Sequence, residues 1–184
     1  MDKCSPPKQS LRKPVSRMRD DVWRARGGRD AYTKEPRTRI LEGDQNVDHV
    51  LEVQIVEHAA LDLLRTNHEL LNRFRDTVNA PPNLNVTARR VNQAKRGPFT
   101  AALNRLRKYD GGLREVSVEQ LARSGRARWL VDEGVWANIE HQAVVSYDDM
   151  ALKMGEARLT RAQTVVMDNV MDNLHRTLEK IHIM

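Results

Sequence analysis

The stretch from 47 to 98 constrains the fold most, because strand-forming, helix-breaking and helix-forming residues follow one another along it. The β-branched and aliphatic residues on both sides of the Asp48-His49 pair predict a short strand. The Pro81-Pro82 pair excludes a helix at that point, whereas 87–95 contains good helix formers and no breaker. We therefore expect a strand, an insert, a short strand or turn, and then a helix.

The insert has the spacing of an amphipathic helix. Apolar residues recur at steps of three and four from 56 to 78, with position 67 as the exception, which predicts one helix of about six turns. Just before it, Glu52 and Gln54 alternate with Val53 and Ile55, so we expect both polar residues on one face of a continuing strand. A solvent-facing row and a role close to a substrate are both compatible with that placement.

The chain is basic, with a net charge of +6 over 184 residues and an isoelectric point of about 9.8. Lys and Arg outnumber Asp and Glu in 1–39 and 86–128, whereas the reverse holds in 40–85 and 129–184. This balance favours a polyanionic partner, although charge alone does not indicate chemistry. A Gly-rich phosphate loop is absent from the sequence, which argues against nucleoside triphosphate chemistry.

Cysteine content and hydropathy indicate the compartment. The one cysteine, Cys4, excludes an internal disulfide and a small secreted scaffold stabilised by disulfides. No apolar run approaches the length of a transmembrane helix, and the N-terminus lacks the apolar core of a signal peptide. We therefore expect an intracellular protein with no membrane partner, in either the nucleus or the cytoplasm.

The length suits one domain, and the N-terminus differs from the rest in composition. Residues 1–19 are rich in Pro, Ser, Lys and Arg and poor in apolar side chains, so we expect a flexible basic arm followed by a single domain over 20–184. The arm suits a nuclear localisation signal or a phosphate-binding tail, and a merely solubilising tail is the alternative. Its basic residues are Lys3, Lys8, Arg12, Lys13, Arg17 and Arg19.

Further helices are predicted after the Gly97-Pro98 pair, which we expect to end the preceding helix. Ser117, with Gln120 three residues later, forms a capping box typical of a helix start. Thr160 begins the last helix, which has a row of apolar residues along one face, called its apolar seam. We expect this seam to pack on the chain's own domain and the protein to be a monomer, with a dimer through 160–184 as the alternative. The predicted fold is α+β and mostly α, with a small β-hairpin and a helix among about five other helices.

Polar residues of the central stretch have a defined order and spacing: Asp48-His49, Asn83-Leu84, and then Asn92 and Lys95 in the pattern N-x-x-K. Each taken singly has an ordinary explanation, as a strand-end pair, a turn former after two prolines, or a solvated helix face. Together they resemble the HNH nuclease family, also called the ββα-metal or His-Me finger group. The resemblance covers about a third of the chain and implies a β-hairpin followed by a helix.

The resemblance implies a role for each motif residue. His49 would be the general base that activates water, and Asn83 would hold the loop that carries this base. Asp48 and Asn92 would supply oxygen ligands to one Mg²⁺, or to Mn²⁺ in its place. Lys95 would lie one turn beyond Asn92 on the same helix face, where it would contact a phosphate or close the motif structurally.

Basic residues around the motif are candidate substrate contacts. Arg37 and Arg39 precede the motif, Arg96 lies within its helix, and Arg105 lies on the basic stretch that follows, for which a solvated helix face is the alternative. Many family members carry two Cys-x-x-Cys pairs that bind zinc, which a single cysteine cannot form, so we expect no structural zinc. Many also have proline where this chain has Glu52.

The sequence therefore favours a metal-dependent endonuclease that hydrolyses phosphodiester bonds in nucleic acid, with DNA the preferred substrate over RNA. The residues suit this chemistry, since a divalent ion neutralises charge that develops on the scissile phosphate and a histidine accepts a proton from water near neutral pH. A catalytically inactive basic helical module that binds nucleic acid or a protein is the alternative. A protein that acts only through its C-terminal helix is a third interpretation.

Overall fold

A computed structural model of the chain describes residues 10–108 and 115–184. Two short strands and eight α-helices lie within these ranges, so the expected α+β, mostly helical fold with a small hairpin is confirmed. In chain order the elements are α1 (Arg19–Ala25), β1 (Gln45–His49), α2 (Val53–Leu64), α3 (His68–Val78), β2 (Leu84–Ala88), α4 (Arg89–Lys108), α5 (Val118–Arg123), α6 (Arg128–Asp132), α7 (Val135–Gly155) and α8 (Arg161–Lys180).

The two strands form an antiparallel hairpin with α4 directly attached to it. Gln45 pairs with Ala88 at one end of the ladder, and His49 pairs with Leu84 at the other. Because α4 begins at the residue after β2, the helix leaves from the end of the hairpin that is farthest from His49. The structure therefore contains the predicted order of strand, insert, strand and helix.

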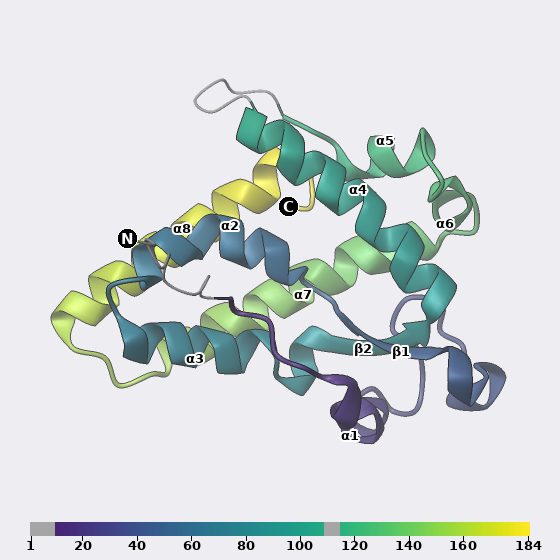
Figure 1. Ribbon diagram of the computed structural model, residues 1–184, viewed down its shortest axis with the longest axis horizontal. Coiled ribbons are helices and arrows are strands. Elements are labelled where there is room, and N and C mark those ends of the chain that lie inside the picture. Colours follow the sequence, from purple (N-terminus) through teal and green to yellow (C-terminus); the bar gives the residue numbers. More distant parts are fainter. Residues whose placement is uncertain (1–9, 109–114) are drawn as a thin grey trace, which may run out of the picture.

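Helices enclose the core around this hairpin. In Figure 1, α7 runs beneath the centre of the molecule, α2 lies beside α8, and α4 lies at the top next to α5 and α6. Phe99 of α4 stacks on Trp136 of α7, with ring centroids 5.9 Å apart. Since burying an aromatic side chain contributes several times the free energy of burying a methyl group, this contact helps to fix α4 over the rest of the domain.

The insert consists of two helices and not of the single helix predicted over 56–78. The chain leaves α2 after Leu64, and Asn67 starts α3 by accepting a hydrogen bond from the Leu70 N–H. Such a side-chain cap satisfies one of the free N–H groups at a helix start, so a second helix can begin here. The apolar spacing skips position 67 and resumes in phase at Leu71, seven residues after Leu64, which is why periodicity alone joined the two helices.

Glu52 and Gln54 do not lie on a strand, because β1 ends at His49 and α2 begins at Val53. Glu52 is the last extended residue before α2, and its side chain is buried. The β-branched residues that suggested a strand instead form the buried face of a helix, since burial outweighs their modest strand preference. The consequence for function is that Glu52 points into the protein and not toward solvent.

The predicted break at Gly97-Pro98 is also wrong, because α4 runs without interruption through Pro98. A proline inside a helix removes one backbone hydrogen bond and costs about 3 kcal/mol. Apolar side chains on both sides of Pro98, including Val91, Phe99 and Leu103, are buried along α4. Their burial offsets that cost and keeps the helix continuous.

The basic arm expected over 1–19 is packed against the domain from Ser10 onward, while 1–9, with Lys3 and Lys8, lie outside the described residues. Leu11 is fully buried and Val15 nearly so. The Ser10 hydroxyl donates a hydrogen bond to Glu57 at 2.6 Å. The domain therefore includes 10–19, because two well-spaced apolar side chains are enough to anchor a short segment.

The helix starts predicted at Ser117 and Thr160 are both present. Ser117 accepts a hydrogen bond from the Gln120 N–H, and Thr160 forms with Gln163 a full capping box that was not predicted. The apolar seam of α8, with Leu174 and Leu178 fully buried, contributes to the core of the chain's own domain. Within the described ranges, no helix has the length and apolar content needed to cross a membrane.

Candidate active site at the hairpin

A buried ion cluster joins the hairpin to α4. Lys95 has no exposed surface, and its ammonium lies 2.6 Å from Asp48 Oδ2 and 3.0 Å from Glu52 Oε1. The same ammonium donates a hydrogen bond to the backbone carbonyl of His49, and the Tyr32 hydroxyl donates one to Asp48 Oδ2 at 2.9 Å. The cluster thus fixes the end of β1, the start of α2 and the second turn of α4 to one another.

The charges in this cluster stabilise each other. Burial alone would lower the pKa of Lys95, but the two carboxylates outweigh burial and raise it, so Lys95 stays cationic at neutral pH. Burial raises the pKa of Asp48 to about 6, although Lys95 opposes that rise. Burial together with Asp48 also raises the pKa of Tyr32, which therefore keeps its proton and donates it.

The sequence left two roles open for Lys95, and the structure decides between them. A fully buried ammonium bonded to two carboxylates and a carbonyl cannot reach a substrate phosphate. Lys95 was named as a substrate-binding residue, and this part of the prediction is wrong. The contacts of Lys95 join α4 to the end of β1, as the second role predicted for this position requires.

The His49 side chain is 3% exposed and is oriented by Asn79. His49 Nε2 lies 2.9 Å from Asn79 Oδ1. The amide nitrogen of Asn79 donates to the carbonyls of Leu11 and Arg75, which fixes the amide orientation and leaves its oxygen toward the imidazole. Nε2 therefore carries the proton in neutral His49, and Nδ1 is the nitrogen with a free lone pair.

His49 is neutral at physiological pH. Burial lowers the pKa of its imidazole below the ordinary value of 6.5, the hydrogen bond that His49 donates to Asn79 opposes this, and the positive charge of Arg12 lowers the pKa further. A neutral imidazole with a free Nδ1 can accept a proton from water. This is the state that the predicted general base requires.

Asn83 ties down the chain that follows His49. Its side-chain oxygen accepts the Leu51 N–H at 2.7 Å, and its amide nitrogen donates to the carbonyls of Leu51 and Val78. These three bonds hold the segment between β1 and α2 against the end of α3. Asn83 thus makes no contact that suggests chemistry, and its contacts fix the backbone beside the histidine.

The predicted metal ligands lie on one side of the hairpin. Asn92 is half-buried and lies one turn before Lys95, so both residues share the face of α4 that is turned to Asp48. Both hydrogen bonds to Asp48 fall on Oδ2, and within the described residues none falls on Oδ1 or on the Asn92 side chain. A carboxylate oxygen and an amide oxygen are donors that suit Mg²⁺, which takes few protein ligands.

Two observations limit the metal site. The part of the chain that the structure describes contains no group of three or more His, Cys, Asp or Glu side chains that could hold an ion. In addition, neighbouring side chains on a strand point to opposite faces, so Asp48 and His49 leave β1 in opposite directions. The structure therefore brings Asp48, Glu52 and Lys95 together and places the His49 imidazole on the other side of the hairpin.

The predicted substrate-contacting arginines are spread over the surface. Arg37 pairs with Asp20 at 2.7 Å and, like Arg39, belongs to the short 3₁₀ turn η2 (Arg37–Arg39). Arg96 and Arg105 are exposed on α4, roughly 13 Å apart along the helix axis at 1.5 Å per residue. These arginines do not converge on His49.

Three residues at the site were not singled out as site residues from sequence, namely Tyr32, Asn79 and Arg12. Tyr32 and Asn79 lie outside the HNH-like pattern, and Arg12 was named only as part of the basic arm. Each reaches the site through the fold, from segments that are distant in sequence.

No family model, curated protein or solved structure matches the chain. The chemistry of the site is therefore argued from its own residues and their geometry.

Proposed function

We propose that the protein is a metal-dependent endonuclease that hydrolyses phosphodiester bonds in nucleic acid, with DNA the preferred substrate. The observation that carries this proposal is the unit formed by β1, β2 and α4, in which Lys95 ties α4 to the Asp48-His49 end of β1. The hairpin and helix are the arrangement that the HNH resemblance implies.

His49 is the general base in this proposal. Its Nδ1 accepts a proton from the attacking water, while Asn79 holds the ring through Nε2. The lowered pKa keeps the imidazole unprotonated and ready at neutral pH. Asn83 keeps the following backbone in place, so the ring does not move with a mobile loop.

Asp48 Oδ1 and the Asn92 side-chain oxygen would hold the Mg²⁺ or Mn²⁺ ion. When bound, the ion supplies positive charge that stabilises the phosphate as negative charge develops on it. Lys95 and Tyr32 hold the Asp48 carboxylate from its other oxygen and thereby orient Oδ1. This assigns Lys95 a positioning role.

The free edge of β1 is where a phosphate would bind. Within the described residues β1 pairs with β2 alone, so its other edge is not covered by a further strand. A phosphate at the edge of a strand can approach side chains from both faces, which is necessary here because Asp48 and His49 point in opposite directions. The proposal thus requires that the substrate lie along the outer edge of β1, near His49.

A second candidate is a basic module that binds nucleic acid without cleaving it. The observation in its favour is that the ammonium of Lys95 already neutralises Asp48, the one charged ligand proposed for the ion. A buried carboxylate with a bound cationic side chain has less affinity for a second cation. In this case the cluster would be purely structural.

The test is plasmid nicking with purified protein, Mg²⁺ or Mn²⁺, and EDTA as the reference. We expect EDTA-sensitive cleavage by the wild type, its loss in His49→Ala and in His49→Gln, and its retention in the control His141→Ala, which changes an exposed histidine on α7. Circular dichroism establishes that each variant is folded. Binding without cleavage of any DNA or RNA by the wild type would establish the second candidate.

A further inference from the structure

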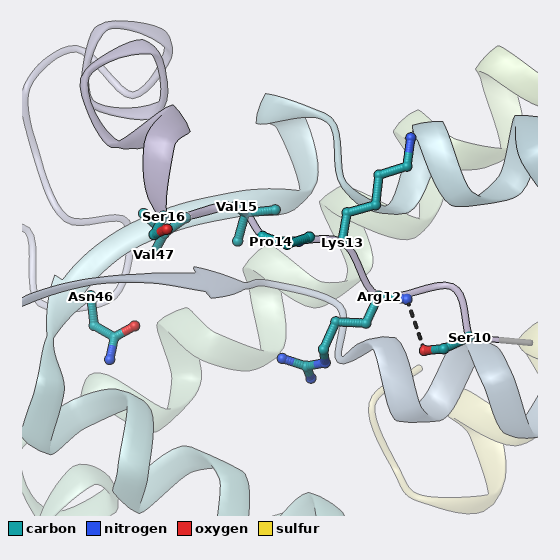
Figure 2. A pocket seen from close by; sticks show the side chains of 8 residues that line it. All are labelled: Ser10, Arg12, Lys13, Pro14, Val15, Ser16, Asn46 and Val47. Atoms are coloured by element: carbon teal, nitrogen blue, oxygen red, sulfur yellow. Dashed lines mark hydrogen bonds between the residues drawn. The ribbon is translucent and has the colours of Figure 1, made fainter. Parts of the chain in front are cut away.

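A cavity of about 560 Å³ lies between the N-terminal segment and β1. Figure 2 shows that one wall comes from 10–16 and the other from Asn46 and Val47 of β1. Its lining includes Arg12, Lys13, two serines and Asn46, and contains no carboxylate within the described residues. A cavity of this size, open to solvent and lined by cations and neutral polar groups, suits an anionic group of nucleotide size.

The backbone on both sides of Arg12 is fixed by one residue, Asn79. Asn79 donates a hydrogen bond to the Leu11 carbonyl at 2.7 Å and accepts one from the Lys13 N–H at 3.0 Å. The side chain of Leu11 is also fully buried. Arg12 is therefore held in a defined position by the same amide that orients His49.

The Arg12 guanidinium differs from the cationic groups of Lys13 and Arg19 in the same segment. The Lys13 ammonium pairs with Asp76, and Arg19 pairs with Glu42. Within the described residues no hydrogen bond or ion pair involves the guanidinium of Arg12. In Figure 2 its side chain extends along β1 toward Asn46, whereas the Lys13 side chain points the other way.

Arg12 is also linked to the candidate base through Asn79, whose side-chain oxygen accepts the Lys13 N–H and lies 2.9 Å from His49 Nε2. An arginine with free donors that faces a cavity, and whose backbone is fixed by the amide that orients the histidine, is placed to bind the group on which that histidine acts. Guanidinium groups bind phosphate oxygens through two parallel hydrogen bonds.

We propose that Arg12 binds a backbone phosphate of the nucleic acid in the cavity between 10–16 and β1, and that Asn79 couples this phosphate subsite to His49. The inference rests on the proposed nuclease function and adds the substrate-binding residue that the dispersed arginines do not supply. Asn46 and Ser16 line the same cavity and offer hydrogen bonds to the sugar or base next to the phosphate. The N-terminal segment is then one wall of the substrate site.

Binding of a short fluorescein-labelled DNA duplex, followed by anisotropy in EDTA, tests the subsite without requiring cleavage. We expect Arg12→Ala to weaken binding about tenfold to a hundredfold, because it removes a charge-assisted contact. The slope of log K against log salt should fall by about 0.9, the contribution of one phosphate contact. Arg12→Lys should recover part of the affinity, since it keeps the charge and loses the paired donors.

The matched control is Arg17→Ala, which removes the same charge from an exposed site five positions along the segment. It should leave affinity near that of the wild type. Equal effects of Arg12→Ala and Arg17→Ala would overturn the proposal, since the segment would then contribute only general charge. If inorganic phosphate displaces the duplex from the wild type only as much as its ionic strength displaces it from Arg12→Ala, this result counts against the subsite. Competition by unlabelled duplex that depends on Arg12 supports the subsite.

Failure of the subsite and failure of the nuclease proposal give different results. If the wild type cleaves DNA and Arg12→Ala cleaves and binds equally well, the nuclease stands and the subsite falls. If the wild type binds through Arg12 but cleaves nothing, the subsite stands and the nuclease falls. Urea denaturation of Arg12→Ala, with a midpoint equal to that of the wild type, excludes unfolding as the cause of lost binding.

Discussion

The ammonium of Lys95 lies 2.6 Å from the carboxylate of Asp48, and both side chains are buried. Glu52 supplies a second carboxylate, whose Oε1 lies 3.0 Å from the same ammonium. This contact joins residues 47 positions apart in sequence and fixes the hairpin to α4. The geometry of the candidate active site therefore depends on a buried ion cluster.

Removal of this ammonium should destabilise the fold strongly. Lys95→Ala leaves Asp48 and Glu52 buried without a counter-charge, and breaking a buried ion pair in this way costs about 3–5 kcal/mol. Urea denaturation measures the loss. The control is Lys153→Ala, which breaks an exposed pair with Asp149 and should cost at most about 1 kcal/mol. Similar losses in the two variants would show that the cluster is not essential for stability.

Asn79 should contribute to both stability and activity. Asn79→Ala removes hydrogen bonds to His49, Leu11, Lys13 and Arg75, and leaves buried groups unpaired at a cost of about 1–3 kcal/mol. Cleavage by the folded fraction should fall as well, because the imidazole loses its orientation. The comparison is Asn72→Ala, on the exposed side of α3, the helix that ends just before Asn79. Full activity of folded Asn79→Ala would show that His49 needs no such support.

The hairpin, the helix after it and the helix caps could be predicted because they depend on local signals. Strand-forming residues surround Asp48-His49, prolines end the insert, and Ser117 and Gln120 have the spacing of a helix cap. The division of the insert at Asn67 depends on one side-chain cap at a position where the apolar pattern lapses once and then resumes, so periodicity did not locate it. The continuity of α4 at Pro98 depends on long-range burial, which propensity does not contain.

The candidate site was predictable only for the residues that belong to the motif. The Asp48-His49 and Asn83 positions follow from the pattern, and the distance from Asn92 to Lys95 places both on one helix face. Asn79 and Tyr32 enter through tertiary contacts, with no spacing that would reveal them. The packing of 10–19 was missed because composition described this segment as a whole, whereas Leu11 and Val15 alone anchor it.

The pH dependence of stability should reveal the buried histidine. Burial lowers the pKa of His49 in the folded chain below its ordinary value of 6.5, so below that pH the unfolded chain binds more protons and stability falls as pH decreases. Asp48 acts in the opposite direction, because a pKa raised to about 6 makes the folded chain take up its proton first. The wild type and His49→Gln share Asp48, so their difference isolates His49.

The measurement is the urea midpoint of both proteins from about pH 7.5 to about pH 5. We expect the wild type to lose stability relative to His49→Gln as pH falls through this range. The exposed His141→Gln serves as the control and should track the wild type. Parallel curves for the wild type and His49→Gln would show that the pKa of His49 is not lowered by folding.

The metal requirement should depend on Asp48 far more than on Asn92. Asp48→Ala removes the only charged ligand proposed for the ion, so cleavage should be lost at every Mg²⁺ concentration tested, whereas Asn92→Asp keeps an oxygen at the same reach and should retain part of the activity. A Mg²⁺ titration of plasmid cleavage measures both effects, and Mn²⁺ serves as the second ion.

Because Lys95 keeps Glu52 as a partner after Asp48→Ala, this variant should remain folded, which circular dichroism checks. Wild-type activity in Asp48→Ala would reassign the carboxylate to the structural cluster alone, and zinc bound at His49 would change that residue from base to ligand.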